Sequence, residues 1–449
     1  MIKKLNIDKA IMLSVVSLAL PAIAEMALHT AVGVADTIMI SRLINKEALA
    51  GSGFVNQIVF MLVFIFSSFN TGAVAMVARS FGEKNYKKLN EIAGQNFSVN
   101  IIIGLVIMLF ALIFSKEIFS IYDMEQVVID YTHTYFNIIV YGLVFLFVSF
   151  AGAALLRGVG DTKTPLYIAL LANVLNIIGN YILITGFWIF PEMGIAGAAL
   201  STTFSRLVSA ALFVYILFFK KYLVHIRSKD LYIKKSVISP LWKFSYPGAI
   251  EQALMQISFV IIGVVISSLD TVSEAAFRIL INIESLSFMP AVGISLAAAT
   301  LVGKALGEKD ADRALKTGYT AAFLGVLWGI FMSVILVLFP RQMILPFTAE
   351  ASLIAISLVP LLLLAINQPM LNYMIVMSGA LRGAGDTRSV MVITALRIWT
   401  LFVPITYVLV HFYGKGIISV WIAEIISFIV FCVIIHLRFA GKKWARIEI

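Results

Sequence analysis

Two carboxyl groups and an imidazole lie at helical spacing near the amino terminus. Glu25, His29 and Asp36 are separated by four and seven residues, within an otherwise apolar stretch. At about 100° per residue they fall within an arc of about 40°. Pro21 lies on the same face and removes a backbone hydrogen bond there. One reading is a polar patch that satisfies itself between helices. We favour the other, a site that binds a proton or a cation.

A second polar set follows in a later apolar stretch. Asn173, Asn176 and Asn180 fall within an arc of about 60° if residues 165–189 are helical. Thr202, in the next apolar segment, can add a hydroxyl. Amide and hydroxyl oxygens are hard ligands that suit Na⁺ or hydrogen-bond a carboxyl group. The alternative is that the amides only join neighbouring helices.

Composition places these residues in a membrane protein. Of the 449 residues, 61% are hydrophobic and only 13% are charged, and the mean hydropathy is +0.99. A soluble chain is roughly half apolar and about a quarter charged. The single cysteine, Cys432, excludes an internal disulfide. The sequence holds no phosphate-binding loop, H-E-x-x-H motif or cysteine pair. We therefore expect no enzyme activity and no cofactor.

Twelve apolar segments are long enough to cross a bilayer. The amino-terminal run reads as the first of them and not as a cleaved signal peptide. Five acids fall inside the segments: Glu25, Asp36, Glu251, Glu284 and Glu424. The segments span about residues 12–40, 51–78, 93–115, 128–155, 165–189, 194–219, 241–268, 276–303, 318–340, 352–380, 390–411 and 416–437.

Basic residues set the expected orientation. If both termini are cytoplasmic, most Lys and Arg residues fall in inner loops, as the positive-inside rule requires. The outer loops then hold only five: Arg42, Lys46, Lys116, Arg341 and Lys415. This bias accounts for the net charge of +10 without a nucleic-acid partner. We expect a multi-pass plasma-membrane protein with both termini in the cytoplasm.

The chain repeats itself. "LLRGVGDT" at 155–162 and "ALRGAGDT" at 380–387 are 225 residues apart. "SFGEKNYKKL" and "ALGEKDADRA" are also 225 residues apart. Two P-x-x-x-E phrases, which end at Glu25 and Glu251, are 226 residues apart. The sequence therefore predicts two parallel six-helix halves, 1–219 and 241–449, joined by a basic cytoplasmic linker at 220–240.

The repeated loop phrase is expected to be structural. Its glycines permit a tight reversal. Its arginines can anchor at lipid headgroups or bind carbonyls at a helix end, and its aspartates can cap the following helix. The residues are Arg157, Gly158, Gly160 and Asp161 in the first copy, and Arg382, Gly383, Gly385 and Asp386 in the second.

Together these motifs resemble the multidrug and toxic compound extrusion (MATE) family, of the bacterial NorM-like or DinF-like type. The resemblance covers essentially the whole chain, through "ALPAIAE", "VADTIMISRL", "RGVGDT", "RGAGDT" and "NIESLSFMP". It implies a V-shaped pair of six-helix lobes with a cavity between them. It also implies export of amphipathic, often cationic drugs in exchange for Na⁺ or H⁺.

The resemblance assigns roles residue by residue. The amino-lobe cation site of the family falls on Asp36, Asn176, Asn180 and Thr202. The carboxyl-lobe site falls on Glu251, while the acid of the tenth helix falls near Leu371, so it is missing here. We group Glu25 with the cation site. We expect a monomer in which three further residues serve substrate binding or lobe closure: Glu251, Glu284 and His29.

Two other functions fit a polytopic helical protein. A flippase for a lipid-linked oligosaccharide usually needs a strongly cationic cavity, and the intramembrane basic residues are few: Arg206, Arg278 and Arg397. A passive channel would not need a titratable site on a kinked helix.

Accessibility of single cysteines tests the orientation. In a Cys432→Ala background, Lys229→Cys should react with an impermeant maleimide only from the cytoplasmic side, and Asp123→Cys only from outside. The expectation follows from the charge bias of the loops. The opposite labelling pattern would reverse the topology.

Overall fold

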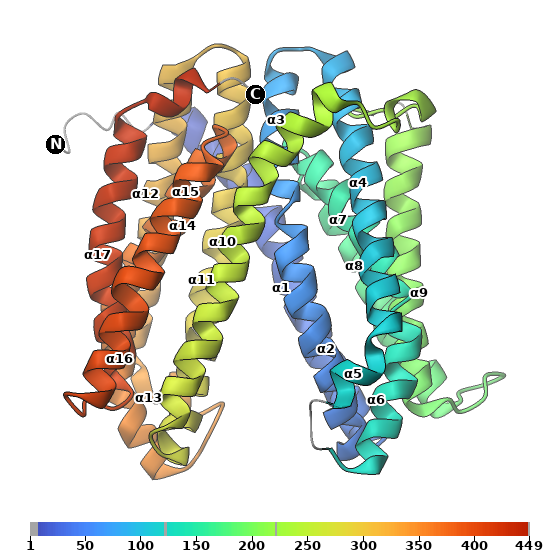
Figure 1. Cartoon of the computed structure of the whole chain (residues 1–449), viewed down its shortest axis with the longest axis vertical. Coiled ribbons are helices and arrows are strands. Elements are labelled where there is room, and N and C mark those ends of the chain that lie inside the picture. The colour runs from blue at the N-terminus through green and yellow to red at the C-terminus, as the bar shows by residue number, and fades with distance from the viewer. Residues whose placement is uncertain (1–7, 121–123, 221, 448–449) are drawn as a thin grey trace. The chain divides into compact units, whose positions relative to one another are not determined.

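The computed structural model describes residues 8–120, 124–220 and 222–447, and all regular structure in them is helical. The first half contains α1 (Lys9–Leu43), α2 (Lys46–Ser67), α3 (Asn70–Gly82), α4 (Tyr86–Ile113), α5 (Ser115–Ser120), α6 (Gln126–Ile139), α7 (Gly142–Gly158), α8 (Lys163–Thr185), α9 (Gly194–Val214), the π-helical turn η2 (Tyr215–Phe219) and the 3₁₀ turn η3 (Ser228–Asp230) (Figure 1). The second half contains α10 (Lys235–Ser267), α11 (Thr271–Gly307), α12 (Ala311–Leu338), α13 (Pro340–Ile344), α14 (Ala351–Gly383), α15 (Thr387–Leu396), the π-helical η4 (Arg397–Phe402), α16 (Val403–His411), α17 (Ile418–Ala440) and the 3₁₀ turn η5 (Lys443–Arg446).

The expected set of membrane spans is confirmed. Eleven helices in the described residues are long and apolar enough to cross a bilayer, α2 and α3 counting as one span. The pair α6 and α7, bent by 49° at its break, gives a twelfth if the two helices count as one span. The chain is therefore an all-helical membrane protein. Asp123, named above as a labelling position, lies outside the described residues.

The chain divides into two compact units. One comprises residues 24–81 and 85–242, and the other comprises residues 8–23, 82–84 and 243–447. The first turns of α1 thus belong with the carboxyl-terminal half. Ile11, Val15 and Ala19 are buried in one core cluster with Ala298 and Val302 of α11. Burial of these apolar side chains explains why the boundary falls inside α1.

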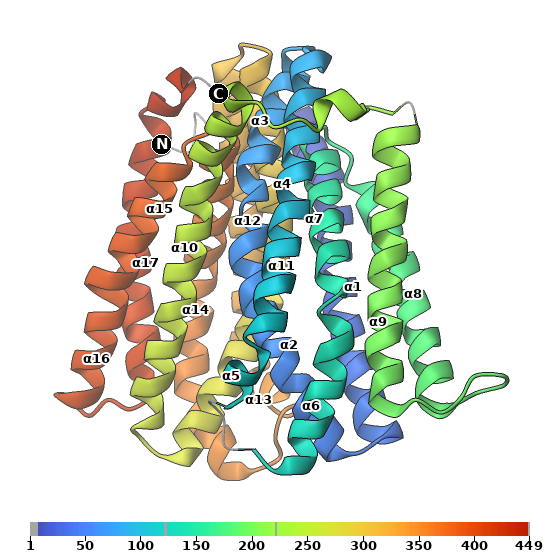
Figure 2. The ribbon, with the colours of Figure 1, turned by 45° about the vertical axis from the view of Figure 1, so that its right-hand side comes forward.

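In the amino-terminal unit, α7 packs against α4 and α9, while α8 packs against α9. The connection to α10 crosses one end of α4 (Figure 2). Ser98 donates to the Leu231 carbonyl (2.9 Å), and Gln95 accepts from the Lys234 amide (3.1 Å). Helix α10 begins at Lys235, so its first residues fall within the segment 220–240 that the sequence analysis names as the linker.

In the carboxyl-terminal unit, α14 packs against α11, α12 and α17. Gly379 and Gly383 lie one turn apart on α14. A Cβ atom at either position would collide with the backbone of α11, at Ser295 and Ala299 respectively. Small residues at this spacing let two membrane helices approach closely. The glycine that follows Arg382 in the repeated phrase is therefore a packing residue.

The repeated loop has nearly the same backbone in both halves. Gly160 and Gly385 both have φ of +87°, where a side chain is strained. Asp161 caps α8, because its Oδ1 accepts from the amides of Lys163 (3.1 Å) and Thr164 (3.0 Å).

The second aspartate departs from the expectation. Asp386 makes no side-chain cap to α15. Its Oδ2 accepts instead from Nε of Arg438, at 2.7 Å. The predicted capping role of Asp386 is therefore wrong. The guanidinium, on the last turn of α17, offers a charge-assisted hydrogen bond that is stronger than one from a neutral amide.

Replacing Gly160 tests the need for its backbone conformation. No atom lies within 4 Å of a Cβ built there, so any loss in Gly160→Ala reports backbone strain. We expect a loss of about 1–2 kcal/mol, seen as a lower melting temperature in detergent. Gly263→Ala is the control, because Gly263 is helical and equally open but has no positive φ. Equal melting of both variants would contradict the argument.

Candidate functional site

Three helices of the amino-terminal unit bring four predicted site residues together. Asp36 lies on α1, Asn176 and Asn180 lie on α8, and Thr202 lies on α9. Asn180 Nδ2 donates to Asp36 Oδ1 at 2.5 Å. Asn176, about one turn earlier on α8, donates to Thr202 Oγ1 at 3.1 Å. Asn173 lies outside this group, because its amide donates to the Leu28 carbonyl.

The group has spare acceptors. Asn176 and Asn180 are buried, and the Oδ1 atom of each has no hydrogen-bond partner among the described residues. Leaving a buried acceptor unpaired costs about 1–3 kcal/mol. The Asn180–Asp36 and Asn176–Thr202 pairs lie about one turn apart on α8, and their carboxylate, amide and hydroxyl oxygens are of the type that a small cation binds.

Arg206 on α9 is a neighbour that the sequence analysis did not connect to the site. Its charge acts on Asp36, and Asp36 acts on it in return. Arg206 is half-buried, and the Nη1 atom of its guanidinium has no hydrogen-bond partner within the described part of the chain. A fixed positive charge beside Asp36 stabilises the ionised carboxylate when no other cation is bound. Asp36 lies on α1 and Arg206 lies on α9, so the sequence alone could not show that the two are close.

Glu25 does not join the Asp36 group. Its Oε1 accepts from Arg157 Nη2 at 2.6 Å, in a buried ion pair. Glu25 and Asp36 share a helix face, but eleven residues separate them by about 16 Å along the axis. His29 Nε2 lies 3.9 Å from the same Glu25 oxygen, and the His29 side chain is 57% exposed. Arg157 therefore reaches an acid on α1.

The carboxyl-terminal unit repeats the same ion pair. Arg382 Nη2 donates to Glu251 Oε1, again at 2.6 Å. Thr394 Oγ1 donates to the same oxygen at 3.1 Å. In each half, the arginine of the loop phrase thus meets the acid of the P-x-x-x-E phrase. Their nearly equal offsets, 225 for the arginines and 226 for the glutamates, were the sign of this pairing in the sequence.

Glu284 lies in a different polar group of the carboxyl-terminal unit. The charges of Glu424 and Arg397 both act on it. Glu424 Oε2 accepts from Asn367 Nδ2 at 2.7 Å. The sequence analysis counted Glu424 among the intramembrane acids but gave it no role. An acid in the interior of a strongly apolar helix, as Glu424 is on α17, was the signal that could have found it.

Comparison with known proteins identifies the family. The MatE family model matches residues 21–182 and 247–408, once in each half of the chain. These two matches cover most of the sequence, and the chain belongs to the MatE family. It is a multi-pass membrane transporter and not an enzyme.

Relatives match over nearly the full length. The chain is 30% identical to the "Probable multidrug resistance protein NorM" of Thermotoga maritima, over 96% of this chain and 92% of the relative. It is 25% identical to the "Multidrug resistance protein NorM" of Photobacterium profundum, over 88% and 86%. A solved "Outward-facing conformation of a multidrug resistance MATE family transporter of the MOP superfamily" shares the fold, with a TM-score of 0.88 and 21% identity over 96% of this chain and 97% of that one.

A double-mutant cycle tests the ion pair of the amino-terminal unit. Arg157→Gln leaves Glu25 buried without its cation and should destabilise the protein by about 3–5 kcal/mol. Adding Glu25→Gln removes the orphaned charge and should restore much of the stability in thermal unfolding.

The control is Arg278→Gln, which breaks an exposed pair with Glu274. It should cost less than about 1 kcal/mol. A double variant that is as unstable as the sum of its two single changes would show that Arg157 and Glu25 are not coupled.

Proposed function

We propose that this protein is a cation-coupled antiporter that exports amphipathic, cationic drugs or toxic metabolites by alternating access. The observation that carries the proposal is Asp36, which accepts from Asn180 about one turn from Asn176, while the buried Oδ1 atoms of both amides have no partner among the described residues. Membership of the MatE family and the multidrug resistance names of the relatives support drug-like substrates. Na⁺ or H⁺ is the coupling ion, taken up at Asp36.

Coupling requires the two ligands to favour different conformations. A bound cation neutralises Asp36 and satisfies the free oxygens of Asn176 and Asn180. When the cation leaves, the carboxylate of Asp36 is ionised and the positive charge of Arg206 stabilises it. The group thus differs in charge between the two states. Cation and drug can compete only if each binds the two conformations with unequal affinity, and each tenfold inequality contributes about 1.4 kcal/mol.

We assign the moving parts to the two halves of the sequence. In this proposal, residues 1–219 and 241–449 are the lobes that rock, with 220–240 as the cytoplasmic linker between them. Glu251, Glu284 and His29 serve substrate binding or lobe closure. Glu251 suits a tuning role, since Arg382 already balances its charge. The protein acts as a monomer in the plasma membrane, with both termini in the cytoplasm.

The pairing of the arginines argues against the flippase alternative. A pyrophosphate headgroup needs cationic side chains that are free to bind it. Arg157 and Arg382 are each committed to a buried glutamate. The negative charge of Asp36 acts on Arg206, and those of Glu424 and Glu284 act on Arg397. The antiporter therefore fits these charges better.

Neutralising Asp36 tests the coupling site. Asp36→Asn should keep the fold and drug binding but lose gradient-driven efflux from proteoliposomes by at least about tenfold, because the amide can neither take up a proton nor balance a cation. Glu251→Gln should weaken apparent drug affinity while efflux still follows the gradient.

Glu125→Gln, at an exposed acid that makes no capping bond, is the control and should behave as the native protein. Efflux is measured under an imposed Na⁺ gradient and then under a pH gradient. If Asp36→Asn still exports against a drug gradient while Glu251→Gln does not, the two roles are reversed.

A further inference from the structure

One loop of the amino-terminal unit exposes an unbroken run of apolar side chains. The loop joins α8 to α9 and has the sequence "GFWIFPEM" at residues 186–193. Phe187, Ile189 and Phe190 are exposed, and Trp188 between them is 83% exposed. Apolar side chains that gather on a protein surface mark a place where another apolar surface or a membrane binds. The loop is therefore a candidate interaction surface.

Backbone contacts hold the base of this loop closed. The Met193 amide donates to the Leu183 carbonyl at 2.9 Å. Gly186 has φ of +70°, and a Cβ atom there would lie 2.6 Å from the backbone nitrogen of Glu192. Trp188 has φ of +64°, a conformation that is strained for a bulky residue. The fold thus holds the apolar run in one exposed arrangement, at a conformational cost.

An exposed apolar stripe runs along α8 toward the loop. Its members fall within an arc of about 80°. They are Leu171, Val174, Ile178 and Tyr181. The side chains of Asn176 and Asn180 point at least about 100° away from every member of the stripe. The Tyr181 ring centroid lies 5.8 Å from that of Phe187, so the stripe continues into the loop. Because α8 is long and apolar enough to span a bilayer, the stripe is the surface of α8 that suits lipid.

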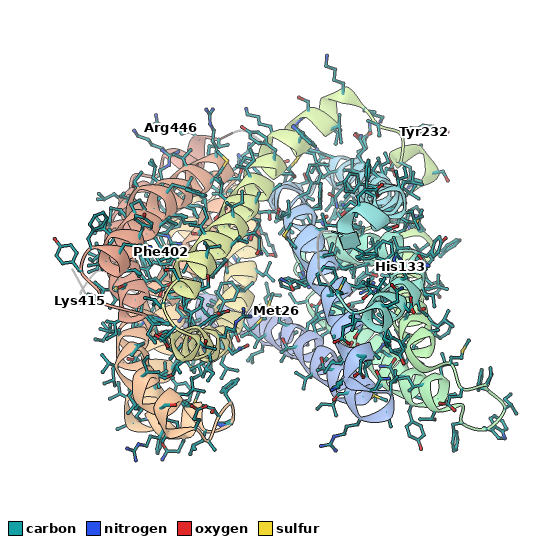
Figure 3. All side chains as sticks on the ribbon, turned by 60° about the horizontal axis from the view of Figure 1, so that its bottom comes forward. Met26, His133, Tyr232, Phe402, Lys415 and Arg446 are labelled. Carbon is teal, nitrogen blue, oxygen red and sulfur yellow. The ribbon has the colours of Figure 1, made fainter. Side chains whose placement is uncertain are left out.

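The other half of the chain exposes an equivalent aromatic pair. Adding the repeat offset of 225 to Phe187 and Trp188 leads to Phe412 and Tyr413. These two lie in the loop between α16 and α17, on which Figure 3 labels Lys415, and they are 75% and 66% exposed. Each half therefore exposes two aromatic side chains directly after its fifth span.

The composition and direction of the first loop indicate a lipid surface as its partner. Glu192 is the only charged residue within 186–193, so the loop offers no cation to an anionic headgroup or an acidic protein. Tryptophan and tyrosine are enriched where a bilayer meets water, because their rings are apolar and carry one polar group. Figures 1 and 2 show the loop extending sideways from the ends of α8 and α9. A loop in this direction runs along a membrane surface and not away from it.

We propose that the loop at 186–193 inserts its apolar side chains into the interfacial layer of the bilayer, and that Phe412 and Tyr413 do the same in the other half. The partner is a phospholipid surface, whatever the charge of its headgroups. The two loops fix the depth at which α8 and α16 end in the membrane. Because α8 also carries Asn176 and Asn180, this anchor holds both amides at a constant depth. The inference depends neither on the antiporter function nor on the orientation of the chain.

Fluorescence quenching in lipid nanodiscs, whose two faces are both open to solvent, tests the proposal. Ile189→Cys or Tyr413→Cys, each in a Cys432→Ala background, carries a bimane label. Glu125→Cys, at an exposed acid in another loop between spans, is the control position. Iodide should quench the label at least about threefold less at Ile189→Cys and Tyr413→Cys than at the control, because interfacial side chains are shielded from water. Lipids with a nitroxide near the headgroup should quench both more than lipids with a nitroxide at the chain end.

A second pair of variants separates the loop from the label. Phe187→Ser with Trp188→Ser, in the Ile189→Cys protein, should raise iodide quenching to the level of Glu125→Cys. Phe412→Ser with Tyr413→Ser is the matched control and should leave the label at Ile189→Cys shielded, because it alters the other half. Elution as a monodisperse species in size exclusion checks the fold, and Trp188→Ser alone replaces the double change if that variant aggregates.

The proposal fails if iodide quenches the label at Ile189→Cys as strongly as at Glu125→Cys, or if the serine changes at positions 187 and 188 leave it shielded. Shielding that occurs only in discs with two copies of the protein would make a second copy the partner and overturn the lipid assignment. Discs of phosphatidylcholine and of phosphatidylglycerol should give the same quenching. Shielding that requires phosphatidylglycerol would overturn a partner defined without headgroup charge.

Discussion

The structure depends on one ion pair that occurs in both halves of the chain. A glutamate four residues after a proline meets the arginine of the loop phrase, with the same 2.6 Å between Nη2 and Oε1 in each half. Both acids are buried, and a charged side chain inside a membrane is costly unless a group of opposite charge pairs with it. The pair fixes one face of α1 and of α10. In α1 the same face carries Asp36, which thereby meets α8.

This pair also explains why the loop phrase is written twice. The arginine neutralises a buried acid, and the glycine after it lets a helix pack closely against a neighbour. The second glycine adopts a backbone conformation that other residues resist. The aspartate has a different role in the two copies: Asp161 caps a helix, whereas Asp386 pairs with Arg438.

Patterns within short stretches of sequence predicted the membrane spans and the side chains that share one face of a helix. Hydropathy located the twelve spans, and helical periodicity placed Asp36 and the α8 asparagines on faces that could meet. Contacts between helices that are distant in the sequence could not be predicted from these patterns. Arg206 near Asp36, Arg438 at Asp386 and Arg397 near Glu424 each join helices whose contact no periodicity encodes. The separation of Glu25 from Asp36 was missed for another reason, because angle around a helix says nothing of depth along it.

The connection between the halves has a mechanical consequence. On α4, Ser98 donates to the Leu231 carbonyl and Gln95 accepts from the Lys234 amide, so the connection has lost much of its conformational freedom. A glycine- and serine-rich tether of this length would behave as a random coil with a wide range of end-to-end distances. The connecting segment is instead short and is hydrogen-bonded to α4, so the covalent connection between the halves can extend only a little. Force applied at α10 would be transmitted to α4 with little loss in stretching the chain.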